Sequence, residues 1–104
     1  MATNTLHLGV ALTGHGWHPH AAERAPATEP VTSARYWTHL AGTAEAGLLD
    51  FLTIDDNLLP QPGGRGDAVL VAARIAPVTR NIGLIPVATV THTEPLHVST
   101  AIAT

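Results

Sequence analysis

Apolar residues follow two patterns along the chain, namely short runs and segments with helical spacing. The run LHLGVAL at 6–12 is apolar almost throughout, a pattern typical of a strand buried on both faces, and DFLTID at 50–55, the end of the apolar stretch that begins just after Gly47, supplies a second strand. A third run, NIGLIPVATV at 81–90, is rich in apolar and β-branched residues and ends in a polar turn. The sequence therefore predicts three strands of the kind that parallel sheets contain.

Segments with helical spacing separate these runs. In the segment 32–47, Thr32 or Ser33 is placed to cap a helix that stops near Gly47. Asp67 is placed to cap a second helix over 67–76, and a third is expected to begin in 96–104. Apolar residues recur along the first of these helices at Tyr36, Leu40, Ala44 and Leu48. The order β-α-β-α-β-α predicts an α/β fold with parallel strands and right-handed crossovers.

Polar side chains follow the carboxyl end of each predicted strand. Because α/β proteins bind ligands at this end of their strands, we expect a site there. The neighbouring carboxylates Asp55 and Asp56 would point to opposite faces, so one is expected to matter, unless one caps a turn and the other is solvated. Thr89 and Thr91 would share a side, either as strand filler or as hydrogen-bond donors. The whole set is Thr13, His15, Asp55, Asp56, Asn57, Thr89, Thr91 and His92.

The segment HGWHPHAAERAPATEP at 15–30 is predicted to be a long loop over this end. It has no apolar period, and long loops that persist in compact domains usually have a function. We expect Trp17 and a histidine, His15 or His18, to face a substrate, with plain solvent exposure as the alternative. A second hypothesis makes His18 and His20 metal ligands of a β/α-barrel hydrolase.

Composition and charge exclude several classes of protein. The net charge is −3, and the sequence contains no lysine. The five arginines are too far apart in the sequence to form a basic stripe, so no nucleic-acid partner is expected. The absence of cysteine excludes disulfides and thiolate metal sites. With neither a signal peptide nor an apolar run long enough to span a membrane, we expect a cytoplasmic protein.

The length of 104 residues fits one domain at most. Charged residues make up only 12% of the chain, about half the usual share, so a self-contained solvated surface is not expected. The last predicted helix carries no terminating signal. We therefore expect residues 1–104 to be the front part of a larger domain.

Three strings, taken together, resemble the amino-terminal part of bacterial luciferase-like flavin-dependent monooxygenases. They are LHLGVAL, EAGLLDFLTIDD and AARIAPVTRNIGLIPVATVTHTEPLHVSTAIAT, and they cover most of the chain outside the first loop. The resemblance is greatest to the branch that includes nitrilotriacetate and dibenzothiophene-sulfone monooxygenases. It implies a (β/α)8 TIM barrel, of which residues 1–104 would hold the first three βα units.

The resemblance also implies a cofactor and partners. Reduced FMN, supplied by a separate flavin reductase, would bind at the carboxyl end of the strands and react with O2 and a small organic substrate. By motif match, Asp56 takes the place of the aspartate near the flavin ring and Thr91 that of the threonine near its polar edge. The whole protein is expected to form a homodimer and this segment alone to be inactive. A non-catalytic remnant or interaction module is the third hypothesis.

Two departures from the family pattern concern the third βα unit. Pro86 lies inside the third predicted strand, where it cannot donate a hydrogen bond, and this predicts a local bulge. The segment HVSTAIAT lacks the arginine that many members carry at this point. A salt bridge from the third helix is therefore not expected.

Overall fold

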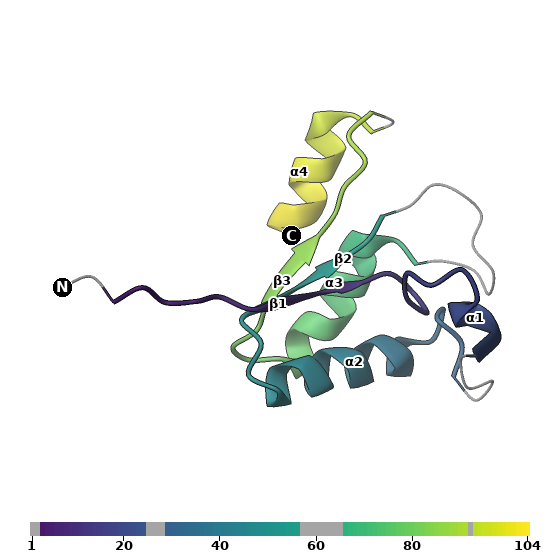
Figure 1. Cartoon of the computed structure of the whole chain (residues 1–104). Coiled ribbons are helices and arrows are strands. Elements are labelled where there is room, and N and C mark those ends of the chain that lie inside the picture. Colours follow the sequence, from purple (N-terminus) through teal and green to yellow (C-terminus); the bar gives the residue numbers. More distant parts are fainter. Residues whose placement is uncertain (1–2, 25–28, 57–65, 92) are drawn as a thin grey trace.

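A computed structural model describes residues 3–24, 29–56, 66–91 and 93–104, apart from the side chain of Ala22. Three strands form one parallel sheet in the order β1-β2-β3 (Figure 1). The predicted α/β order with parallel strands is confirmed, and it is compatible with the first βα units of a barrel. The elements are β1 (Gly9–Leu12), α1 (Ala21–Arg24), α2 (Ala34–Ala46), β2 (Phe51–Ile54), α3 (Ala68–Ile75), the 3-10 helix η1 (Ala76–Val78), β3 (Gly83–Pro86) and α4 (Pro95–Ala103).

The core lies between the sheet and helices α2 and α3, which cover one of its faces (Figure 1). Leu52 and Ile54 of the central strand are 0% and 1% exposed, and Ile75 of α3 is 0% exposed. Trp37 of α2 packs into the same cluster, where its Nε1–H donates to the carbonyl of Val31 at 2.7 Å. Burial of these apolar side chains is the main stabilising contribution to the fold.

The opposite face of the sheet is formed by the odd-numbered strand residues and is much more open. Phe51 is half-buried on this face, and a Cβ on Gly9 would overlap its ring. The prediction that the strands are buried on both faces is therefore wrong for the described residues, because α2 and α3 cover only one. The open face carries Gly9, Ala11, Phe51, Thr53, Gly83 and Ile85.

Both predicted helix caps are confirmed. The side chain of Ser33 accepts from the backbone N–H of Arg35 at the start of α2, and the side chain of Asp67 accepts from that of Leu70 at 2.9 Å. The segment predicted as a loop over 15–30 contains one helical turn, α1. In the described part of the chain, no helix has both the length and the apolar character that a membrane crossing requires.

The end of α2 differs from the prediction at Leu48. The helix stops at Ala46, and Leu48 lies beyond it with a φ of 61° and 87% of its surface exposed. Leu48 was expected on the apolar face of the helix, and that expectation is wrong. The left-handed conformation that turns the chain from α2 towards β2 falls on Leu48, since Gly47 has a φ of −77°.

Pro86 sits in β3 without the predicted bulge. The register from Phe51↔Gly83 to Ile54↔Pro86 is one to one. Gly83 N donates to Asp50 O at 2.8 Å and Val87 N donates to Ile54 O at 2.9 Å. Donors to a parallel neighbour come from alternate residues, so the nitrogen of Pro86 faces the other edge of β3 and no bond to β2 is lost.

Candidate functional site at the carboxyl end of the sheet

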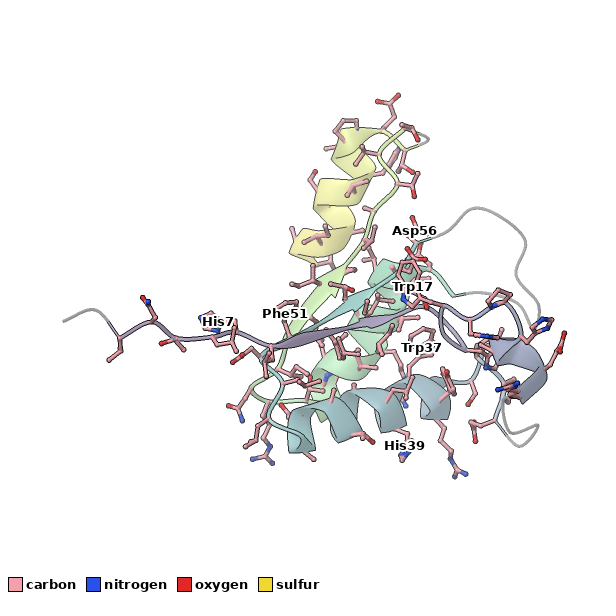
Figure 2. The ribbon with its side chains drawn as sticks, in the orientation of Figure 1. His7, Trp17, Trp37, His39, Phe51 and Asp56 are labelled. Carbon is pink, nitrogen blue, oxygen red and sulfur yellow. The ribbon has the colours of Figure 1, made fainter. Side chains whose placement is uncertain are left out.

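The carboxyl ends of the three strands meet at one edge, and the predicted side chains gather beyond it. Asp56 and Trp17 lie on this side of the sheet, whereas His7 and Phe51 lie towards the amino end (Figure 2). Asn57 and His92, which were also predicted to belong to the site, lie outside the described residues. The parallel strands thus place the candidate groups of all three units at the same end.

Asp56 and Thr89 bind each other across the ends of β2 and β3. Asp56 Oδ2 accepts from the backbone N–H of Thr89 at 3.2 Å, and Thr89 Oγ1 donates to the carbonyl of Asp56 at 3.2 Å. Both residues are half-buried, while the neighbouring Asp55 is exposed. Of the two carboxylates, Asp56 is therefore the one held in a defined position.

Thr91 lies in the turn after β3 and is exposed. The described contacts of Asp56 are with Thr89 and not with Thr91. The sequence pattern had left open whether Thr89 is strand filler or a hydrogen-bond donor. The register explains the contact, because Ile54 pairs with Pro86 and an extension of that pairing by two residues brings Asp56 next to the 88–89 segment. The sequence alone does not give the alignment of β2 with β3. With that alignment known, Thr89 could have been identified as the partner of Asp56.

Thr13, at the end of β1, carries a buried hydroxyl without a partner. Its Oγ1 makes no hydrogen bond within the described part of the chain. Buried hydroxyl groups in native proteins nearly always have a partner, so an unpartnered one marks a place for a water molecule or a ligand. This hydroxyl adds a hydrogen-bonding group to the same end of the sheet as Asp56.

Tyr36 of α2 fixes the first part of the loop after β1. Its hydroxyl donates to the carbonyl of Gly14 at 2.6 Å, and the ring of His15 packs edge-on against it with ring centroids 6.0 Å apart. Burial raises the pKa of Tyr36 above its ordinary value of 10.0, so the hydroxyl remains a donor at neutral pH. His15 is thus held half-buried against α2, whereas Trp17 is 80% exposed and His18 is exposed.

His18 and His20 lie in the next part of this loop, with ring centroids 5.8 Å apart. His18 Nδ1 lies 3.1 Å from the backbone N–H of His20, and His20 Nδ1 lies 3.1 Å from Glu23 Oε2. A nitrogen that accepts from N–H carries no proton, and one that faces a carboxylate carries one. These contacts therefore place the proton of neutral His18 on Nε2 and that of neutral His20 on Nδ1.

The same contacts bear on the hypothesis that His18 and His20 are metal ligands of a hydrolase. A histidine binds a metal through a nitrogen without a proton, and the only such nitrogen of neutral His18 is already used to accept from His20. Within the ranges that the structure describes, no group of three or more His, Cys, Asp or Glu is placed to hold a metal ion. No observation thus favours a metal centre at this loop.

The fold and these groups define an α/β protein with a polar site at the carboxyl end of a parallel sheet, and comparison with known proteins narrows the class. The chain is 35% identical over 102 residues to N-acetyl-S-(2-succino)cysteine monooxygenase of Bacillus subtilis (strain 168). It is 32% identical over 117 residues to dibenzothiophene-sulfone monooxygenase of Rhodococcus erythropolis (strain XP), and 30% over 114 residues to nitrilotriacetate monooxygenase component A of Aminobacter aminovorans. No protein-family model matches the chain.

These relatives confirm the predicted resemblance to the nitrilotriacetate and dibenzothiophene-sulfone monooxygenase branch. The three alignments cover 90%, 95% and 90% of this chain but only 23%, 26% and 25% of the relatives. The chain therefore spans about a quarter of the length of the curated relatives it matches. The similarity supports a monooxygenase function in general terms.

Proposed function

We propose that residues 1–104 supply the first three βα units of a luciferase-like (β/α)8 barrel that acts as a flavin-dependent monooxygenase. The observation that supports this most is the set of polar groups at the carboxyl ends of the parallel strands, namely the Thr13 hydroxyl and the Asp56–Thr89 pair. The three alignments, each over at least 90% of the chain, agree with it. A barrel needs further strands to close, so we expect no turnover from these residues alone.

The donor and acceptor groups at this end fit a flavin ring, whose polar edge carries both carbonyl oxygens and N–H groups. Asp56 would accept from that edge, while the Thr13 and Thr91 hydroxyls would donate to it. The bonds to Thr89 hold Asp56 in place before a ligand arrives, which lowers the cost of ordering the site. Reduced FMN, when bound, supplies the electrons with which O2 is activated.

The loop after β1 would line the substrate mouth. Trp17 offers an exposed apolar surface, while Tyr36 and His15 hold the base of the loop against α2. A loop fixed at its base can exclude water from the site while its outer part contacts the substrate. The relatives are named for two carboxylate compounds and for a sulfone, so substrates differ within the group.

A separate flavin reductase is part of the proposal, as the source of reduced FMN. One relative is named as component A of its monooxygenase, which agrees with a system of more than one protein. A homodimer of the whole protein and a cytoplasmic location remain predictions from the sequence.

Flavin binding tests the proposal directly. Titration of the chain with FMN, followed by quenching of flavin fluorescence, should show binding that weakens roughly tenfold in Asp56→Asn, because a charged acceptor is lost. Asp55→Asn is the matched control, since this neighbouring carboxylate is exposed. Equal affinities for the unaltered chain and for both variants would remove Asp56 from the site, and a complete absence of flavin binding would count against the assignment of these residues to a flavin site.

A further inference from the structure

The loop after β1 holds two imidazole rings whose hydrogen bonds fix what each can offer to a ligand. Neutral His18 has its proton on Nε2, because its Nδ1 accepts from the backbone N–H of His20. His20 Nδ1 faces Glu23 Oε2 at 3.1 Å, so its Nε2 is the nitrogen left for another partner. Both side chains are exposed and therefore reachable from solvent.

We propose that His18 and His20 together bind one carboxylate group of an organic acid. When His20 is protonated, it donates one N–H to Glu23 and has a second N–H at Nε2, and His18 supplies its own Nε2–H. With each N–H···O bond at roughly 2.9 Å, the two oxygens of a carboxylate can connect rings whose centroids are 5.8 Å apart. The two donors match in number the two oxygens of a carboxylate.

Glu23 orients the imidazole ring of His20 in the free protein, because its Oε2 lies 3.1 Å from His20 Nδ1. The titratable groups that the described contacts bring to His20 are His18 on the same loop and Glu23 on α1. A carboxylate ligand would thus meet an imidazolium that is already oriented by its partner, as in other charge-assisted pairs. That this subsite belongs to the substrate mouth rests on the proposed function, whereas carboxylate binding itself does not.

Succinate is a suitable probe, and the imidazole proton resonances of the chain are a suitable signal. At pH 6, succinate should shift the resonances of His18 and His20 and leave those of His39, which is exposed on α2, in place (Figure 2). His20→Gln should weaken binding roughly tenfold because a charged donor is lost, and His39→Gln should leave it unchanged.

Three results would overturn the proposal. They are shifts of His39 as large as those of His18 and His20, equal binding of the uncharged analogue succinamide, and tighter binding of inorganic phosphate than of succinate. The titration contains no flavin, so its failure leaves the assignment of Asp56 untouched. Failure of the flavin titration would in turn leave the carboxylate site in place without a role in a monooxygenase.

Discussion

The two ends of the sheet use their polar groups differently. At the amino end, Glu45 Oε1 accepts from three consecutive backbone N–H groups, those of Arg80, Asn81 and Ile82, at 2.8, 2.6 and 3.1 Å. Asp50 Oδ2 accepts from the backbone N–H of Leu8 at 2.7 Å at the same end. The carboxylates there are used to hold the chain segments that lead into β1 and β3.

At the carboxyl end, the polar groups make fewer hydrogen bonds within the described part of the protein. In the described part of the chain, the Thr13 hydroxyl has no partner, Trp17 is 80% exposed, and Asp56 is held by two bonds to Thr89. Hydrogen bonds that are satisfied within the protein contribute to its stability, while unsatisfied groups remain free for a ligand. Among the described residues, the amino end therefore uses its carboxylates to stabilise the fold, while the carboxyl end keeps groups that the proposed site can use.

The largest loss of stability is expected at the amino end from Gly9→Ala. The new methyl group would overlap the Phe51 ring, and overpacking of this kind costs about 1–3 kcal/mol. Gly42→Ala in α2 is the matched control, since nothing lies within 4 Å of its added Cβ, and it should stabilise the helix by about 1 kcal/mol. Urea unfolding measures both changes, and equal effects would show that Phe51 moves aside freely.

Glu45→Gln should destabilise the chain in a pH-dependent way. The backbone N–H of Asn81 above all, followed by those of Arg80 and Ile82, lowers the pKa of Glu45 from its ordinary value of 4.5. Because the folded pKa is depressed, this stabilisation is present above about pH 4.5 and is lost as the pH falls through the lower folded pKa. Unfolding measured at pH 7 and at successively lower pH should show a difference between the variant and the unaltered chain that is full at pH 7 and narrows below about pH 4.5, with Glu94→Gln as the control.

Leu48→Gly should stabilise the chain by about 1 kcal/mol. A left-handed φ of 61° is costly for leucine and accessible to glycine, and the exposed side chain gives up little packing. Leu70→Gly, at an exposed position within α3, should instead cost about 1 kcal/mol, because glycine there only loosens a helix. Thermal unfolding of the two variants checks the opposite signs.

A smaller effect on stability is expected at the carboxyl end, from Thr89→Val. It removes the hydroxyl bond to the Asp56 carbonyl and keeps the backbone N–H bond to Asp56 Oδ2, so the loss should be no more than about 1 kcal/mol. Thr91→Val, at an exposed position, should change the unfolding free energy by less than about 0.5 kcal/mol. A loss for Thr89→Val larger than that for Glu45→Gln at pH 7 would reverse the comparison between the two ends.

The sequence by itself determined the order of the elements, the parallel direction of the strands and two of the helix caps. Apolar runs and helical spacing are local properties, and a cap depends on a residue only two or three positions from its partner, as Ser33 and Asp67 show. The same local strings were enough to indicate the monooxygenase relatives. The roles of Asp56 and Thr91 at a flavin remain predictions.

Only the tertiary structure decided which residues meet across the chain. Asp56 binds Thr89, Glu45 binds the 80–82 segment and Tyr36 binds Gly14, and the partners in these pairs lie 22 to 37 positions apart. Such contacts depend on the alignment of one strand against the next and on which face the helices cover. A shift of the β2–β3 register by a single residue would change the partner of Asp56 while leaving the local pattern of the sequence as it is.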